Sequence, residues 1–141
     1  MIQQLADIRE SRNRQALLVL DIDYFKAIND LHGHAAGDVA LSDLAAILRF
    51  ELRANDKVFR FGGEEFVILA ETGSREALEC FAERIRKAVY QALRGPDGRI
   101  TVSLGAAMYA GEQRWQDWFT RADAALYQAK RKGRNSVSVA P

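Results

Sequence analysis

The sequence has few of the features that mark secreted, membrane-spanning or nucleic-acid-binding proteins. Cys80 is its only cysteine, which excludes a disulfide framework within the chain and favours a cytosolic setting. No apolar run approaches the length of a membrane span, and no signal peptide is visible. The 20 basic and 19 acidic side chains leave a net charge of +1, so bulk electrostatics favour neither nucleic acid nor an anionic membrane. Any polyanion therefore has to be bound by a local cluster of charges.

Repeats, low-complexity segments and internal boundaries are also missing, so we expect a single domain over residues 1–141. In the first half we expect a helix over 3–13, a strand over 16–22, a short helix over 24–31, a long helix striped by Leu41, Leu44, Leu48 and Leu52, and strands over 57–61 and 65–70. In the second half we expect a helix with Leu78, Phe81, Ile85, Ala88 and Leu93 in register, a strand over 100–108, a helix over 115–131 and an edge strand over 136–140. From the first strand onward the order is β-α-α-β-β-α-β-α-β, which contains the split βαβ of a ferredoxin-like sheet. The predicted fold is α+β, with a central antiparallel sheet flanked by helices.

Two turns and a group of aromatic residues also lead to structural expectations. Residues 33–38 are predicted to form a Gly-rich turn, and a turn role is favoured over metal binding for the flanking His32 and His34. The segment 95–98, Gly-Pro-Asp-Gly, is predicted to end the helix before it. Aromatic side chains in the helix over 115–131 favour core or dimer packing over a platform for stacking bases. These aromatics are Trp115, Trp118 and Phe119.

The segment 60–66 reads Arg-Phe-Gly-Gly-Glu-Glu-Phe and runs directly into an apolar strand. Gly62 and Gly63 can take positive φ and let a phosphate approach the backbone without a Cβ in the way. Glu64 and Glu65 add hard oxygen ligands of the kind that Mg²⁺ takes alongside substrate phosphates. A plain β-hairpin with a charged tip explains this segment equally well when it is taken alone.

A second carboxylate pair changes that balance. Asp21 and Asp23 follow the apolar run 16–20 and, with period-two alternation, point to the same side of the strand. Paired carboxylates at a strand end, facing a Gly-Gly-Glu-Glu turn, suit a site where a divalent metal meets a nucleotide. For Asp21 we favour the ligand role. For Asp23 we favour the cap of the helix that begins near Tyr24, because Asp is a preferred N-cap residue.

With both carboxylate clusters placed, the chain resembles the GGDEF domain of diguanylate cyclases, in its Gly-Gly-Glu-Glu-Phe form. The resemblance runs from Leu17 to Asn135 and rests on Asp-x-Asp-x-Phe-Lys-x-x-Asn-Asp, Gly-His-x-x-Gly-Asp, the turn at 62–66, Val-Ser-x-Gly and Ala-Asp-x-Ala-Leu-Tyr-x-Ala-Lys-x-x-Gly-Arg-Asn. It implies a nucleotidyl-cyclase palm-type sheet and a transient homodimer in which each subunit holds one GTP. The implied reaction joins two GTP into cyclic di-GMP and releases two pyrophosphates, with Mg²⁺, or alternatively Mn²⁺, as cofactor.

The resemblance also assigns roles to individual residues. Asp21 and the backbone carbonyl of Ile22 would bind Mg²⁺ together with Glu65, and Glu64 would activate the 3′-OH while also touching metal. Asn29 and Asp38 would read the guanine edge. The phosphates would be held by Lys26, Lys130, Arg134 and the backbone at Phe25, Gly62 and Gly63, with Lys26 acting on the reacting phosphate. Without the resemblance, residue type alone favours turn and cap roles for Asn29 and Asp38, and a solvated basic helix end for Lys130 with Arg134.

Arg53 and Asp56 form an Arg-x-x-Asp pattern just before the signature turn. By position they resemble the family's inhibitory site, at which product dimers bind. The planar fork of Arg53 suits a guanine edge or a phosphate. An ion pair at a helix end is the alternative, and we expect product inhibition.

One part of the family pattern is missing, the Asp-x-Leu-Thr-Gly-Leu-x-Asn-Arg segment that normally opens the domain. We therefore expect the chain to be a truncated piece of a longer protein, in which an N-terminal domain supplies sensing or dimerisation and which can be membrane-anchored. The alternative functions are a catalytically silent GTP or cyclic di-GMP sensor and a cyclase that makes a cyclic mononucleotide. The intact turn at 62–66 argues against the sensor, and the guanine-reading pair with the inhibitory site argues against the mononucleotide cyclase.

Overall fold

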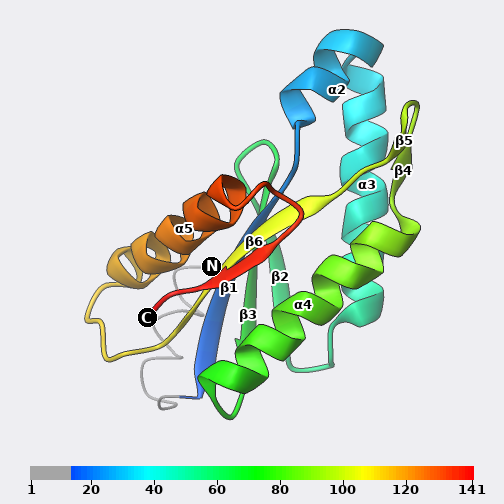
Figure 1. The fold of residues 1–141 in the computed structure, drawn as a ribbon. Helices are drawn as coiled ribbons and strands as arrows, with labels where there is room; N and C mark the ends of the chain where they lie inside the picture. Colours follow the sequence, from blue (N-terminus) through cyan, green and yellow to red (C-terminus); the bar gives the residue numbers. More distant parts are fainter. Residues whose placement is uncertain (1–13) are drawn as a thin grey trace.

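A twisted sheet forms the centre of the fold. The structure is a computed structural model that describes residues 14–141, so the helix predicted over 3–13 lies outside the described part. Within that part the main sheet has five strands in the order β2-β3-β1-β6-β7 (Figure 1). They are β1 (Gln15–Ile22), β2 (Lys57–Phe61), β3 (Glu65–Glu71), β6 (Val102–Met108) and β7 (Val137–Val139). β1 lies in the middle and pairs antiparallel with β3 and β6, as its continuous apolar run predicts.

The short strand β7 pairs parallel with β6 and forms one edge of the sheet, as predicted. Side-chain cations occupy two of its carbonyls. Lys132 Nζ donates to the carbonyl of Val137 at 2.6 Å, and Arg75 Nη2 donates to that of Val139 at 2.9 Å. The other edge of the sheet is β2.

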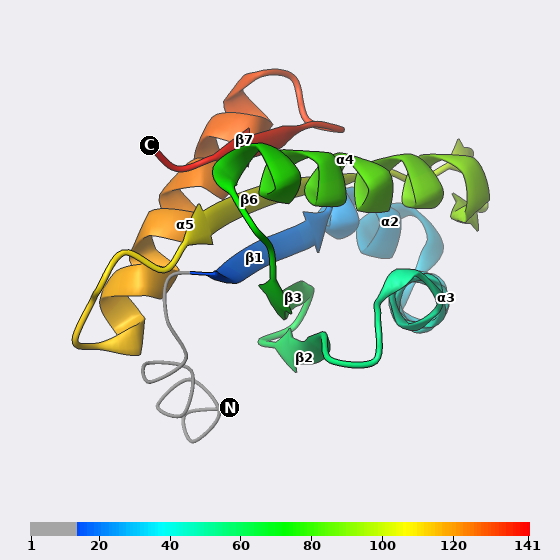
Figure 2. The same ribbon diagram turned by 90° about the horizontal axis from the view of Figure 1, so that it is seen from below.

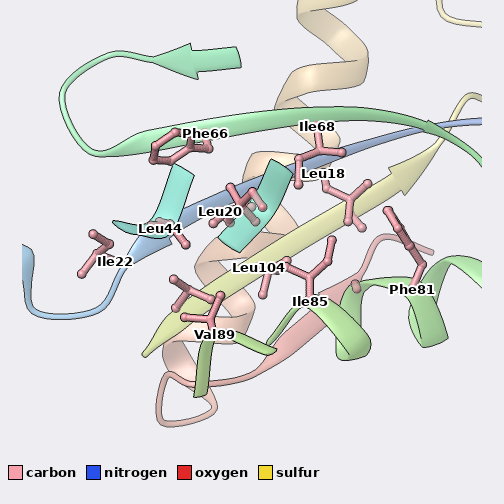
Figure 3. Close-up of a cluster of buried hydrophobic side chains, with 14 of the residues drawn as sticks. Leu18, Leu20, Ile22, Leu44, Phe66, Ile68, Phe81, Ile85, Val89 and Leu104 are labelled. Atoms are coloured by element: carbon pink, nitrogen blue, oxygen red, sulfur yellow. The ribbon is translucent and has the colours of Figure 1, made fainter. Parts of the chain in front are cut away.

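The described part has four helices, and three of them cover the two faces of the sheet (Figure 1). The four helices are α2 (Phe25–His32), α3 (His34–Glu51), α4 (Arg75–Ala92) and α5 (Trp115–Arg131). α5 lies on one face, and α3 and α4 lie on the other (Figures 1 and 2). Because side chains alternate along a strand, Leu18 and Leu20 of β1 pack with residues of α3 and α4 (Figure 3), whereas Leu17 and Val19 pack against Trp118 of α5. No helix within residues 14–141 combines the length and the apolar character needed to cross a membrane.

Trp118 of α5 is a core residue, and Trp115 and Phe119 pack partly buried against the same core, which confirms the packing prediction for these three aromatics. Trp118 is 2% exposed and its Nε1–H donates to the carbonyl of Ala107 at 2.9 Å. The Phe61 ring of β2 lies 6.4 Å from the Trp115 ring and 5.1 Å from the Phe119 ring, measured between ring centres. These contacts bind the start of α5 to the edge of the sheet.

The turn predicted over 33–38 is wrong in extent. Gly33 alone, with φ 89°, separates α2 from α3, and the residues after it are helical. His34 therefore begins α3, and His32 ends α2. Leu52 and Ala88, both expected on core stripes, are only partly buried, because α3 ends before Leu52 and Val89 faces the core in α4.

The segment 95–98 does more than end a helix. It turns a small hairpin of β4 (Arg94–Gly95) and β5 (Gly98–Arg99), which the sequence reading missed, and the following strand begins at Val102 rather than at residue 100. His32 Nε2 lies 2.7 Å from Asp97 Oδ2. This contact ties the hairpin to the end of α2.

Gly105 of β6 is needed for the close approach of α5 to the sheet. A Cβ at this position would overlap the backbone of Ala122 and Leu126. We expect Gly105→Ala to lower the free energy of unfolding by roughly 1–3 kcal/mol, the usual cost of overpacking a core, in urea denaturation. Gly73→Ala is the control and should stay within about 0.5 kcal/mol of wild type, because the nearest atom to its Cβ would be Arg14 Nη2 at 3.7 Å. Equal stability of the two variants would contradict the proposed contact.

Candidate active site

A cavity of about 430 Å³ opens at the carboxyl end of β1, next to the start of α2 and the end of α5. Its lining includes Asp21, Ile22, Asp23, Tyr24, Phe25, Lys26, Glu64, Lys130 and Arg134. Residues far apart in the sequence thus meet where the first strand ends. Both predicted carboxylate clusters and all three cations predicted to hold phosphates contribute to this one cavity.

Asp21 is the most deeply buried carboxylate that lines the cavity, at 4% exposed. Its Oδ2 accepts a hydrogen bond from Lys130 Nζ at 2.7 Å, while its Oδ1 is buried without a partner among the described residues. Glu65 lies directly opposite Asp21 in the pairing of β1 with β3. A buried carboxylate oxygen without a donor is costly, so these residues fit a divalent cation.

The carboxylates do not form a ready-made metal cage. Within residues 14–141, no three His, Cys, Asp or Glu side chains converge closely enough to hold an ion together. Instead, Lys130 supplies the positive charge at Asp21. The assignment of Asp21, Ile22, Glu64 and Glu65 as metal ligands therefore stays a prediction.

Burial and mutual repulsion act on all three carboxyl groups. Burial raises the pKa of Asp21 above its usual value, against the opposing effect of the Lys130 ammonium. Burial, and then the charge of Asp21, raise the pKa of Glu64. Burial, followed by the charges of Asp123 and Asp21, raises the pKa of Glu65. Burial and the neighbouring carboxylates therefore disfavour the charged forms of these three groups.

These raised pKa values predict a pH dependence of stability. A carboxyl group with a higher pKa in the folded state stabilises the fold fully below its unfolded pKa, and that contribution is lost as the pH rises through the folded pKa. The unperturbed pKa of Glu65 is 4.5. As the pH rises from 4.5 to neutrality without divalent ions, we expect the free energy of unfolding to fall more in wild type than in Glu65→Gln. Urea denaturation at several pH values measures this difference, which Mg²⁺ should reduce. An identical pH dependence in both proteins would contradict the raised pKa of Glu65.

Asp23 does not cap α2, so that prediction is wrong. The N-cap of α2 is Tyr24, in the left-handed region at φ 59°, and no side chain caps the helix there. The Asp23 carboxylate is instead 5% exposed and accepts three hydrogen bonds from outside its own segment. Their donors are Thr101 Oγ1 at 2.7 Å, Ser103 Oγ at 2.6 Å and the backbone N–H of Asn135 at 2.9 Å.

The three cations reach the cavity from α2, from α5 and from the turn that follows α5. Lys26 is exposed on α2 and pairs with Asp30 at 3.0 Å. Lys130 extends from α5 to Asp21, and the Arg134 guanidinium lies 4.8 Å from the centre of the Tyr24 ring. Their common location supports a shared anion, because each is positioned independently of the others.

The Gly-Gly turn is open, as expected for a backbone that a ligand approaches. Gly62 has φ 81° and needs glycine, whereas Gly63 is outside the positive-φ region, which corrects the expectation for that residue. A Cβ at either glycine would meet no heavy atom within 4 Å. Arg60 donates from Nε at 3.1 Å and Nη2 at 2.6 Å to the carbonyl of Gly63, which fixes the shape of the turn.

A family model described as "Diguanylate cyclase, GGDEF domain" matches residues 1–136. The chain belongs to the GGDEF domain family. A curated relative, diguanylate cyclase DgcP of Pseudomonas aeruginosa, is 46% identical to this GGDEF domain over 127 residues, or 88% of the chain. The chain spans only 19% of the length of that relative. It spans 36% of the length of another relative, diguanylate cyclase A of Treponema denticola, so it corresponds to one part of these longer proteins.

Solved structures agree with the fold of this GGDEF domain. The GGDEF domain of DgcB from Caulobacter crescentus, in complex with c-di-GMP, has a TM-score of 0.87 at 33% identity, over 98% of this chain and 84% of that one. The active GGEEF domain of a diguanylate cyclase from Vibrio cholerae has a TM-score of 0.86 at 32% identity, over 99% and 90%. The predicted α+β architecture is thereby confirmed.

The two residues predicted to read guanine come from neighbouring helices of the GGDEF domain, Asn29 from α2 and Asp38 from α3. Asp38 lines a groove of about 580 Å³ beside the β2 edge. The other polar side chains of this groove are Ser42, Arg49 and Arg60. Asn29 lines neither cavity, and its Oδ1 is buried against Gly37 without a partner among the described residues. Nothing in the sequence indicated that Arg49 lines this groove, because Arg49 occurs in no motif. Nor did the sequence indicate that Arg60, which precedes the turn, donates hydrogen bonds to the carbonyl of Gly63.

The Arg-x-x-Asp pattern of the GGDEF domain forms an ion pair at the end of α3. Arg53 Nε lies 3.1 Å from Asp56 Oδ2, and Arg53 Nη2 donates to the carbonyl of Glu71 at 3.0 Å. The guanidinium groups of Arg53 and Arg84 each lie 5.1 Å from the centre of the Phe81 ring. α3, with 18 residues, separates this cluster from the end of α2 by about 27 Å along its axis. Arg84, from α4, is an addition that sequence spacing did not reveal.

Proposed function

We propose that this GGDEF domain is the catalytic domain of a diguanylate cyclase, which condenses two GTP molecules into cyclic di-GMP. The observation that carries the proposal is the single cavity in which Asp21 and Glu64 face Lys26, Lys130 and Arg134. A metal-bound triphosphate requires carboxylates, which hold the metal, together with cations, which neutralise the phosphates. The relatives named above are diguanylate cyclases, which supports the same reaction here.

In the proposed reaction, the 3′-OH of each GTP attacks the α-phosphate of the other. A bond forms between the 3′-oxygen and the phosphorus, the bond to the β-phosphate breaks, and pyrophosphate leaves. Glu64 accepts the proton of the 3′-OH. The raised pKa of Glu64 favours this role, because a base acts best when its pKa approaches the working pH. Two turnovers of this step close the ring.

The remaining residues hold and orient the substrate. Lys26 and Arg134 would hold phosphates, and Lys130 would leave Asp21 to join them. Asp21, the carbonyl of Ile22 and Glu65 would hold Mg²⁺ or Mn²⁺, with Glu64 beside it. Such an ion, when bound, neutralises the charge that develops on the phosphate oxygens.

Guanine recognition is proposed to involve Asp38 of α3 and Asn29 of α2. We propose that Asp38 accepts from the guanine N1–H and exocyclic amine, as its exposed position allows. Asn29 would contribute after its Oδ1 rotates away from Gly37. Guanine carries this pair of adjacent donors and adenine lacks it, so the two residues would reject ATP.

The reaction needs two domains, because each GTP supplies a nucleophile to the other. We propose a transient homodimer with the two cavities facing each other, and an additional N-terminal domain in the parent protein that promotes this pairing. We also propose a cytoplasmic location, where GTP would be available as substrate.

Product identity tests the function directly. We would incubate the chain with GTP and Mg²⁺ at increasing protein concentrations and identify the product by chromatography and mass. Cyclic di-GMP, formed at a rate that rises faster than linearly with protein, is the expected result. A cyclic mononucleotide, or GTP binding without any product even after fusion to a dimerising helix, would contradict the proposal.

Product inhibition is proposed to act through Arg53 and Asp56. We expect Arg53→Ala to raise the concentration of cyclic di-GMP needed for half inhibition by about tenfold or more, because a charge-assisted hydrogen bond to the product is lost. Initial rates with added product measure this effect. Arg114→Ala, an exposed position before α5, is the control and should leave inhibition unchanged. Unchanged inhibition in Arg53→Ala would mean that the pair only closes the end of α3.

A further inference from the structure

Asp23 connects three segments that are far apart in the sequence. Its carboxylate receives the hydroxyls of Thr101 and Ser103, at the start of β6, and the backbone N–H of Asn135, after α5. Its own N–H donates to the carbonyl of Thr101 at 2.9 Å. We infer that Asp23 is a positioning residue, which holds the 133–135 turn so that Arg134 faces the phosphates of GTP. This inference rests on the proposed function and adds a residue to it.

The 133–135 turn needs such support because its backbone is unfavourable. Gly133, Arg134 and Asn135 have φ values of 114°, 65° and 44°, three successive residues in the positive-φ region. Two of them carry a Cβ, and such conformations persist only where the surroundings hold them. Backbone bonds hold the first part of the turn, from the Gly133 N–H to the Lys130 carbonyl at 3.2 Å and from the Arg134 N–H to the Ala129 carbonyl at 3.3 Å. Asn135 is held by side chains, because its N–H donates to the Asp23 carboxylate and its Oδ1 accepts from Arg86 Nη1 at 2.8 Å.

The hydrogen bond of Asp23 directs the side chain next to it. Asp23 and Asn135 are bonded, and their chain neighbours Tyr24 and Arg134 face each other with the guanidinium 4.8 Å from the ring centre. Tyr24 is itself in the left-handed region, at φ 59°. The unfavourable backbone positions at Tyr24 and Arg134 therefore lie next to the hydrogen bond between the Asn135 N–H and Asp23. This bond connects the two segments and so presents the Arg134 guanidinium to the cavity.

Asp23 cannot be assigned to the metal by the same geometry. Its Oδ1 accepts from Ser103 Oγ, and its Oδ2 accepts from Thr101 Oγ1 and the Asn135 N–H. By contrast, Asp21 has one oxygen without a partner among the described residues. The two aspartates of the Asp-x-Asp pattern therefore have different tasks.

A double-mutant cycle separates positioning from general structural support. Binding of α,β-methylene GTP with Mg²⁺, an analogue that cannot be cleaved at the reacting bond, is measured by calorimetry. We expect Asp23→Ala and Arg134→Ala each to weaken binding about tenfold, and the double variant to be no weaker than Arg134→Ala within about twofold, because interacting residues are non-additive. Asp23→Asn should stay within about threefold of wild type. Its amide oxygen can accept the Asn135 N–H, and Ser103 can rotate to accept from the amide.

Each result has a defined meaning. Additive losses in the cycle, or unchanged binding in Arg134→Ala, would overturn the positioning role. Absence of binding by wild type would overturn the proposed function as well, so the two failures are distinguishable. Thermal unfolding by circular dichroism verifies that each variant is folded. If Asp23→Ala does not fold, Asp23→Ser replaces it in the same cycle, because its shorter hydroxyl does not reach the Asn135 N–H.

Discussion

Glu64→Gln should lose turnover by roughly a hundredfold or more while GTP affinity stays within about threefold of wild type, because an amide cannot take the proton of the 3′-OH. The glutamine keeps the size of the side chain and its place in the cavity lining. It also removes a carboxylate whose pKa burial and Asp21 raise, so the folded state should lose no stability. Turnover is measured as cyclic di-GMP formation under saturating GTP, and affinity as calorimetric binding of α,β-methylene GTP.

The control for this variant is Glu71→Gln, at the opposite end of β3 from the signature turn. It makes the same chemical change outside the cavity and should retain turnover. A parallel loss of turnover and affinity in Glu64→Gln would show that Glu64 binds substrate or metal and is not the base.

Asp21→Asn should abolish the response to Mg²⁺, with turnover falling by about a hundredfold or more, since a metal supplies several kcal/mol of charge stabilisation. The melting temperature without divalent ions should not fall. Burial raises the pKa of Asp21, so its charged form is costly, and an amide oxygen can still accept the hydrogen bond from Lys130. Mg²⁺ should raise the melting temperature of wild type with nucleotide present, and not that of the variant.

Asp43→Asn provides the matched control, because this aspartate is exposed on α3 and lines no cavity described above. It should respond to Mg²⁺ as wild type does. If Asp21→Asn keeps its response to Mg²⁺, Asp21 is not a metal ligand, and its role is to accept the hydrogen bond from Lys130.

The long elements and the carboxylate edge were predictable from the sequence because they depend on strong local patterns. The buried run 16–20 could only be a central strand, and the period-two alternation placed Asp21 at its end. The signature turn followed from Gly62, whose φ of 81° suits glycine. Lys130 and Arg134 were placed only by the family resemblance, since nothing local links α5 to β1.

The failures share one physical cause, which is competition between local and long-range partners. Asp is a good N-cap residue, but Asp23 has three donors from residues 101–135 and none from its own helix. These three contacts have no signature in the residues next to Asp23, so the spacing of the sequence does not reveal them. The left-handed backbone at Tyr24 and Arg134 was unpredictable for the same reason.

The cations on β7 have a consequence for how copies of the domain associate. An edge strand with free carbonyls is a template for adding a strand from another molecule, which leads to open-ended aggregates. Here Lys132 and Arg75 already fill the carbonyls of Val137 and Val139. The other edge, β2, carries the exposed Lys57 and Arg60, whose charges oppose sheet-to-sheet docking. We therefore expect both sheet edges to resist fibre growth when many copies are crowded together, which leaves the cavity end of the domain available for the proposed homodimer.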